Sequence, residues 1–168
     1  DYFRHELDRM KMADVFTREK KSHVMSRIRS RDTKPEMLIR KGLHRLGYRF
    51  RLHDKRLPGK SDLVLRRYRT AIQVRGCFWH SHDCNDGHIP KSRQDYWKPK
   101  LEANKNRVAK NDAALESMGW KVMIIWECRC SNKAGLNNVL KKIDDEHKVR
   151  RIDIEDANQS ASKAIAKT

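Results

Sequence analysis

Residues 73–84 gather the side chains best suited to chemistry, including two of the four cysteines, two histidines and two large aromatic residues. Cys77, His82 and Cys84 are zinc-type donors placed close together in a polar loop. Ordinary buried cysteines are common, but two cysteines that bracket a histidine favour a metal site. The spacing differs from that of a zinc finger, so a fourth ligand has to come from elsewhere in the chain.

Two distant cysteines are candidates for that fourth ligand. Cys128 directly follows the apolar segment 121–126, which is typical of a strand, and a strand end is a rigid place from which to hold a metal. Cys130 lies farther into a basic loop. We therefore favour Cys128.

Two carboxylates are candidates for a second, harder metal. Asp62 follows the turn residues Leu57-Pro58-Gly59 and precedes an apolar segment, so it either caps the turn or binds Mg²⁺, which prefers oxygen ligands. Glu36 completes the capping box that begins at Thr33, and it could in addition hold a metal-bound water.

His80 has two interpretations. A histidine outside the metal centre suits a general base that activates water. His80 could instead replace His82 as the zinc ligand, and the spacing alone leaves both assignments open.

The aromatic pair Phe78-Trp79 either packs in a small satellite core or inserts between bases. The second role is favoured by the basic residues nearby, Arg75 among them, because apolar side chains can wedge into a DNA stack. Met25, in a basic N-terminal segment, is a second candidate wedge, although core filling is the commoner role of a methionine.

Local signals predict the elements that must position these residues. A helix should begin at the Thr33–Glu36 capping box and end near Gly47. Strands are predicted over 48–52, 63–65, 71–74 and 121–126, the last being the most buried, with helices over 92–118 and 136–148. The helix 92–118 carries an apolar stripe that reaches Met118 and includes Asn104. This order predicts an α/β fold, with a central mixed sheet flanked by helices.

Length and charge narrow the functional classes. The chain has 168 residues and a formal net charge of +17, which suits one domain that binds a polyanion such as nucleic acid. We assign 1–16 to an N-terminal extension, 17–150 to the domain with its basic arm, and 151–168 to a flexible tail. Because we find no apolar segment of membrane-spanning length or secretory signal, we expect a cytoplasmic protein without a membrane partner.

The same residues resemble the very short patch repair (Vsr) family of DNA mismatch endonucleases. The resemblance runs from about Ser22 to Cys128, and the string Gly76-Cys77-Phe78-Trp79-His80 joined to the later Trp126-Glu127-Cys128 is highly specific. Other matching positions are Met25, Arg31-Asp32-Thr33, Glu36, Leu57-Pro58-Gly59, Asp62, Cys84, Trp97, Lys100, Asn104, Arg107 and Gly119-Trp120.

The resemblance implies a restriction-endonuclease-like fold with structural Zn²⁺, and Mg²⁺-dependent nicking of double-stranded DNA 5′ to the thymine of a T:G mismatch by a monomer. It implies that Asp62 and the backbone carbonyl of Val74 bind Mg²⁺, that His80 activates water, and that Glu36 holds a metal-bound water. The implied zinc ligands are Cys77, His82, Cys84 and Cys128. The implied DNA contacts are Met25, Phe78, Trp79, Trp97, Lys100 and Asn104.

Four positions depart from the family pattern. Arg75 replaces a histidine and Val108 replaces the aspartate that accompanies it, which indicates one coupled change. Arg75 would then hold a phosphate or the water around the metal. Val74 replaces a threonine and Ser61 a proline; a carbonyl ligand survives the first change. The alternatives are a restriction-like endonuclease with another specificity, and a zinc-stabilised DNA-binding module without catalysis.

Overall fold

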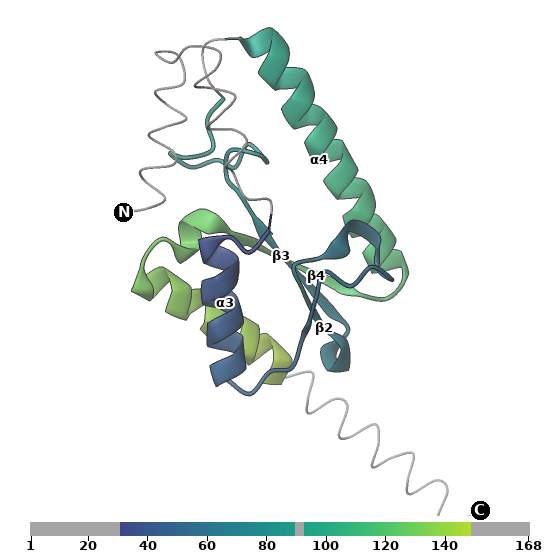
Figure 1. Cartoon of the computed structure of the whole chain (residues 1–168), viewed down its shortest axis with the longest axis vertical. Coiled ribbons are helices and arrows are strands. Elements are labelled where there is room, and N and C mark those ends of the chain that lie inside the picture. The colour runs from purple at the N-terminus through teal and green to yellow at the C-terminus, as the bar shows by residue number, and fades with distance from the viewer. Residues whose placement is uncertain (1–30, 90–92, 149–168) are drawn as a thin grey trace, which may run out of the picture.

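The computed structural model describes residues 31–89 and 93–148 (Figure 1). Met25, the proposed extension 1–16, the arm 17–30 and the tail 151–168 lie outside the described residues. The longer elements are α3 (Lys34–Arg45), β1 (Arg51–Leu52), β2 (Leu63–Leu65), β3 (Thr70–Arg75), α4 (Gln94–Ser117), β4 (Lys121–Trp126) and a helix over residues 133–148. Short 3-10 helices cover Pro58–Lys60, Arg66–Tyr68 and Glu127–Cys130. Among the helices within these ranges, none combines the length and apolar composition needed to span a bilayer.

The strands form one four-stranded mixed sheet in the order β1-β2-β3-β4. β1 pairs with β2 and β2 with β3 antiparallel, whereas β3 and β4 are parallel, from Thr70 opposite Lys121 to Arg75 opposite Trp126. The carboxyl ends of β3 and β4 therefore meet at the same edge of the sheet. The predicted α/β class with a mixed sheet is confirmed.

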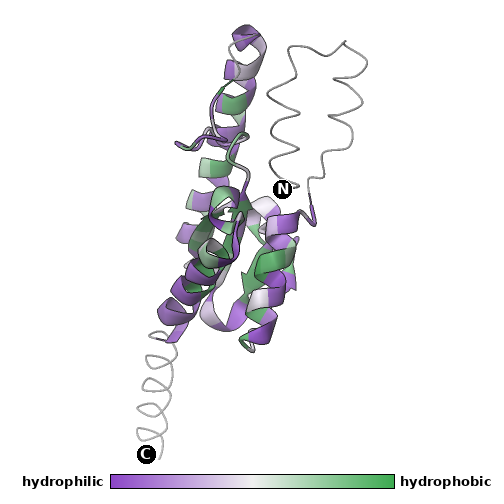
Figure 2. Ribbon diagram, turned by 90° about the vertical axis from the view of Figure 1, so that its left-hand side faces the viewer, coloured by the Kyte–Doolittle hydropathy of each residue, from purple (hydrophilic) through white to green (hydrophobic). Residues whose placement is uncertain are grey.

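Helices cover both faces of the sheet, and the alternation of side chains along each strand divides the core in two. On one face Ile72 and Met123 pack with residues of α3 and with Ile143 of the helix 133–148. On the other, Ala71 packs with Leu115 of α4. Figure 2 shows the hydrophobic colour concentrated on the strands between these layers. The N-terminal half of α4 extends beyond the sheet, beside the loop that follows β3 (Figure 1).

The start of α3 differs from the predicted capping box. Thr33 is the N-cap residue, but its side chain makes no capping bond to the helix backbone. Its hydroxyl instead donates to Glu36 (2.9 Å), which also accepts the backbone N–H of Asp32 (2.9 Å). The helix ends as expected, with Gly47 in the left-handed region at φ 82°.

Three predictions about burial or extent were wrong. The strand predicted over 48–52 is confined to Arg51–Leu52. β4 is not the most buried strand, because it lies at an edge and leaves Ile124 43% exposed, whereas all three residues of β2 are buried. Met118, predicted on the apolar stripe, follows the end of α4 and is exposed.

Arg69 fastens the β2–β3 connection to the end of α4. Its Nε donates to the carbonyl of Gly119 (3.2 Å) and its guanidinium also donates to the carbonyl of Met118 (2.6 Å). These carbonyls lie where a helix end leaves acceptors unsatisfied. The contact thus links two elements separated by about fifty residues of sequence.

Replacing Arg69 with alanine should lower the free energy of unfolding by about 1 kcal/mol, because two exposed carbonyls lose a charged donor. Arg67→Ala is the matched control, since Arg67 is exposed in the same connection. Urea denaturation of both variants measures the difference. Equal effects of the two substitutions would contradict this role of Arg69.

Candidate active site and metal centre

Three cysteines and one histidine come together at the edge where β3 and β4 end. Cys77 follows β3 after Gly76, and Cys128 lies in the 3-10 helix that follows β4. Because the two strands are parallel and in register, their ends deliver both cysteines to one place. The donor atoms of Cys77, His82, Cys84 and Cys128 all lie within 4.8 Å of one another.

Of the alternatives that the sequence left open, the structure brings His82 and Cys128 into this cluster. His82 stacks on Trp126 with ring centroids 4.1 Å apart, and its Nδ1 lies 3.7 Å from the Cys128 Sγ. His80 is outside the cluster. Cys130 is also outside it, buried in the core beneath the sheet.

The donors fit a structural zinc ion. Burial raises the pKa of the Cys77 and Cys128 thiols, and Cys84 lies beside both. A cation among these donors would reverse that penalty by binding the thiolates, because metal binding releases thiol protons. Within the part of the chain that the structure describes, the cluster consists of three cysteines and one histidine, which matches the closed set of four ligands that zinc prefers.

Glu127 holds the start of the loop, a role that sequence reasoning missed. Its carboxylate accepts the backbone N–H of Cys77 (2.6 Å) across a separation of 50 residues. The only sequence signal is its position beside Cys128, in the string that carries the resemblance. Glu127 therefore fixes the backbone at Cys77 from the 3-10 helix that also carries Cys128.

Asp62 lies at the head of β2, beside the end of β3. Its Oδ2 accepts the backbone N–H of Val74 (2.7 Å), and its Oδ1 lies 4.0 Å from His53 Nδ1. Burial raises the pKa of the Asp62 carboxyl to about 6, a shift opposed by the Val74 bond and increased by the negative charge of Glu36.

These surroundings fit a hard cation. The carboxylate is desolvated, has a second carboxylate nearby and retains a side-chain exposure of 21%. A cation that reached this oxygen would stabilise the charged form that burial disfavours. Asp62, with the main chain of Val74, is thus suited to bind Mg²⁺.

Glu36 is buried in a network that sequence reasoning did not anticipate. Arg40 pairs with both Glu36 (2.9 Å) and Asp32, and it lies 3.4 Å from His53 Nε2. Donor atoms of Asp32, Glu36 and His53 lie close enough for a cation, but the Arg40 guanidinium already supplies positive charge there. The network connects α3 to Asp62 through His53.

His80 lies in the loop after β3, on the side facing α4. Burial, and after it the positive charge of Arg75, lower the pKa of its imidazole to about 4. Arg107 and Lys105 act in the same direction, while Asp112 opposes them. The ring is therefore neutral at physiological pH and can accept a proton.

Arg75 is held by two residues that the sequence did not identify. Its Nη2 donates to Gln73 Oε1 (2.8 Å) and to Asp112 Oδ2, and Gln73 Nε2 donates to Asp112 Oδ1 (2.8 Å). The family pattern has its aspartate at the position of Val108. Asp112 lies one helical turn farther along α4. A search one turn along α4 for a displaced carboxylate would have found it.

An aromatic cluster with lysine covers the N-terminal half of α4. Phe78 lies between Trp79 and Trp97, with centroids 5.2 Å from each, and it is only 5% exposed. Lys100 Nζ lies 5.1 to 5.8 Å from the rings of Tyr96, Trp97 and Trp79. Insertion of Phe78 between bases would require it to leave this cluster.

Asn104 joins the same cluster to the loop. Its Nδ2 donates to the backbone carbonyl of Trp79 (2.8 Å), and its Oδ1 accepts from Arg107. Asn104, the amide on the apolar stripe, thus binds the backbone of the loop after β3. Its predicted position near DNA is a separate role.

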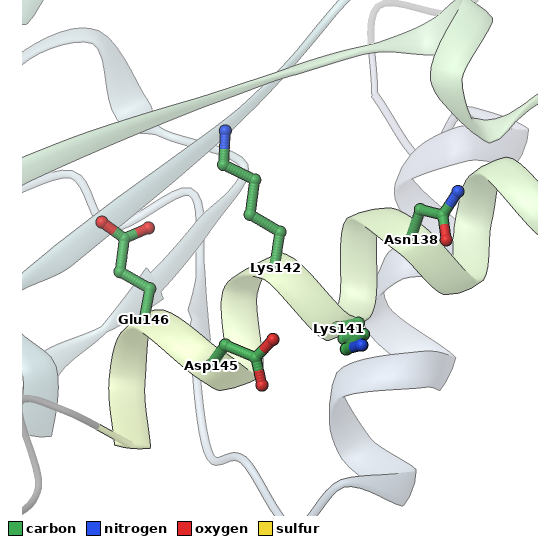
Figure 3. A pocket seen from close by; sticks show the side chains of 5 residues that line it. All are labelled: Asn138, Lys141, Lys142, Asp145 and Glu146. Atoms are coloured by element: carbon green, nitrogen blue, oxygen red, sulfur yellow. The ribbon is translucent and has the colours of Figure 1, made fainter.

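A shallow hollow on the helix 133–148 lies apart from these residues (Figure 3). Its lining has mixed charge and polarity: Asn138, Lys141, Lys142, Asp145 and Glu146. None of these is a predicted site residue.

Comparison with known proteins decides the family. The family model for DNA mismatch endonuclease Vsr matches residues 13–86. The chain is 34% identical over 154 residues to DNA mismatch endonuclease Vsr of Escherichia coli, covering 92% of this chain and 94% of that protein. The chain belongs to the Vsr family of DNA mismatch endonucleases.

Two further relatives are named as nicking enzymes. The type II nicking enzyme V.NmeAIP of Neisseria meningitidis serogroup A is 48% identical over 138 residues, covering 80% of this chain and 99% of the relative. The type II nicking enzyme V.XorIIP of Xanthomonas oryzae pv. oryzae is 46% identical over 134 residues, covering 80% and 98%. This Vsr-family chain is accordingly a DNA endonuclease.

Proposed function

We propose that this Vsr-family protein is a Mg²⁺-dependent endonuclease that nicks double-stranded DNA on the 5′ side of the thymine in a T:G mismatch. The observation that carries the proposal is the bond from the Val74 N–H to Asp62, which joins a cation-binding carboxylate to the strand that leads to His80. We further propose a restriction-endonuclease-like fold, a structural Zn²⁺, and action as a cytoplasmic monomer.

The roles of the acidic residues follow from their surroundings. Asp62 and the Val74 carbonyl would hold Mg²⁺, which when bound stabilises the charge that develops on the phosphate. Glu36, fixed by Arg40, would orient a water of that ion. Because Glu36 is buried and rigidly paired, it suits an indirect role better than direct contact with DNA.

His80 is the proposed general base. Its neutral imidazole takes a proton from water as the water oxygen attacks phosphorus, and the bond to the 3′ oxygen breaks. Zinc takes no part in this step. Its proposed ligands Cys77 and His82 lie on either side of His80 in the sequence, so zinc would hold the loop that carries the base.

The aromatic cluster is the proposed contact with the mismatch. Trp79 and Trp97 present ring faces and edges beside Lys100, which suits unstacked bases together with phosphate charge. Phe78, buried between these two rings, would reach the DNA only by leaving the cluster. Lys100 and Asn104 would lie toward the same DNA, and Met25 would contribute from the N-terminal segment.

The decisive measurement is the nicking of labelled duplexes that carry either a T:G mismatch or the matched pair, with Mg²⁺ present. We expect a single cut in the mismatched strand, on the 5′ side of the thymine, and little cutting of the matched duplex. Equal cutting of both would favour a restriction-like endonuclease. Binding without cutting would favour the non-catalytic module.

His80→Ala should reduce the nicking rate by roughly 10² to 10⁴-fold, the usual contribution of a general base. Zinc content, measured on the same sample, should stay at the wild-type level because His80 is outside the metal cluster. His88→Ala is the control, since His88 is an exposed histidine of the same loop. Loss of zinc from His80→Ala would refute its assignment as the base.

A further inference from the structure

We propose that Asp112 and Gln73 are positioning residues, which hold Arg75 by one guanidinium nitrogen so that its remaining N–H groups bind the scissile phosphate. The proposal rests on the proposed function, because it concerns the same phosphate. It extends the site to a residue of α4 and a residue of β3 that the family resemblance did not supply.

The three side chains form a closed ring of hydrogen bonds. Gln73 and Arg75 are two residues apart on β3, so both point to the face that α4 covers. Asp112 meets them from α4, with one carboxylate oxygen on Gln73 and the other on Arg75. Side-chain exposures of 11% for Arg75 and 17% for Asp112 show that this pair is largely screened from solvent.

The ring leaves part of the guanidinium available. Both bonds from Arg75 start at Nη2, and among the described residues its buried Nε has no hydrogen-bond partner. A buried donor without an acceptor is costly, so an acceptor is expected when the site is complete. Two phosphate oxygens can accept parallel hydrogen bonds from a planar guanidinium in a bidentate arrangement.

The position of Arg75 fits this acceptor. The preceding residue, Val74, donates to Asp62, and the Arg75 charge acts on His80. Arg75 is therefore the chain neighbour of the residue that binds the carboxylate proposed for the metal, and its charge is close enough to act on the proposed base. A phosphate that reached both would lie next to the guanidinium.

A role for Asp112 as a surface charge alone and a role in positioning Arg75 differ in what they predict for the nicking rate. Asp112 is a negative charge near a proposed DNA-binding surface, so its removal should leave duplex binding unchanged or tighter. If Asp112 positions Arg75, the same removal should lower the rate of the chemical step. The two roles are separated by measuring binding and rate independently.

The experiment compares single-turnover nicking and duplex affinity for Asp112→Ala, Asp112→Asn, Arg75→Ala and the double variant Asp112→Ala/Arg75→Ala. We expect Asp112→Ala to nick roughly 10²-fold more slowly at unweakened duplex affinity, as when one oriented donor is lost from a charged transition state. Asp112→Asn, which keeps an acceptor but loses the charge, should fall between. The double variant should be no slower than Arg75→Ala, because the effect of Asp112 acts through Arg75.

Glu116→Ala is the matched control, since Glu116 is an exposed acid one turn farther along α4. It should nick at the wild-type rate. Nicking of Asp112→Ala at the wild-type rate, or an equally large further loss on the Arg75→Ala background, would overturn the positioning role.

A second readout keeps this inference separate from the mismatch proposal. The Nε–H signal of Arg75 in an NMR spectrum should shift when a duplex is added to the wild type, and should not shift in Asp112→Ala. If wild-type protein leaves the T:G duplex uncut but this difference is seen, the proposed function fails and the positioning role stands. If the signal is unmoved by duplex in the wild type, the positioning role fails whatever the protein cuts.

Discussion

Cys77→Ser should purify without zinc and without a cooperatively folded loop after β3, whereas the wild type should carry one zinc ion per chain. Cys77 starts the loop and shares its metal cluster with His82, Cys84 and Cys128. A structural zinc site contributes on the order of 10 kcal/mol of apparent binding free energy. That is comparable with the whole stability of a typical domain, about 5 to 15 kcal/mol. Loss of one ligand should therefore lower the melting temperature more than any single core substitution.

Loss of zinc from Cys77→Ser should also abolish nicking. His80 and the aromatic residue Trp79 lie in the same loop, between the proposed ligands Cys77 and His82. When the ligands no longer hold the loop, both should lose their places, so nicking should disappear with zinc. Elemental analysis, thermal unfolding and the nicking assay measure the three effects on one sample.

Cys130→Ala provides the matched control. Cys130 is as buried as a core residue, at 5% exposure, but it packs beneath the sheet and outside the metal cluster. Its truncation should cost about 1 kcal/mol for the lost packing and leave zinc in place. If Cys130→Ala lost zinc while Cys128→Ala retained it, the geometric choice between these cysteines would be wrong.

The sequence predicted what depends on local chemistry. Gly47 and Gly119 ended their helices where left-handed backbone was required, and the apolar segment 121–126 became β4 with both boundaries correct. The preference for Cys128 over Cys130 rested on its place just past a strand end, and Cys128 is the one that lies among the four donors that could hold a metal. In each case a few neighbouring residues determined the outcome.

Contacts between distant side chains could not be predicted in the same way. Asp112 meets Arg75 across 37 residues, and Glu127 meets Cys77 across 50. Each pairing depends on how α4 lies on the sheet or how β4 aligns with β3, which no local pattern specifies. The burial of β4 was mispredicted for a related reason, since an apolar strand is buried only where a helix covers it. Ile124 lies where cover is missing.

Asp62→Asn should abolish nicking and at the same time stabilise the Mg²⁺-free protein at neutral pH. Burial raises the pKa of the Asp62 carboxyl from 3.8 to about 6. Its ionised form is thus disfavoured by folding, at a cost on the order of 2 kcal/mol above pH 6. Asparagine removes that charge and can still accept the Val74 N–H, but it is a far weaker ligand for Mg²⁺.

The sign of the pH dependence follows from the raised pKa. Above about pH 6 the wild type carries the full cost of the buried charge. In this range the free energy of unfolding of Asp62→Asn should exceed that of the wild type by the largest amount. Between pH 6 and pH 4 the wild-type carboxyl takes up its proton in the folded state, and the margin should shrink toward zero. Thermal unfolding across this range, in buffer without Mg²⁺, measures the trend.

Asp54→Asn is the control of opposite sign. Asp54 is also buried, but its bonds with Arg56 lower the pKa of its carboxyl, so its charge stabilises the fold. Asp54→Asn should therefore destabilise the protein at neutral pH and retain nicking, where Asp62→Asn stabilises and loses it. A carboxylate that lowers stability but is needed for activity is a ligand-binding residue. A carboxylate that raises stability and can be replaced without loss of activity is a structural residue. If Asp62→Asn were destabilising without Mg²⁺ at pH 7, Asp62 would belong to the second kind, and the proposed Mg²⁺ site would have lost its main support.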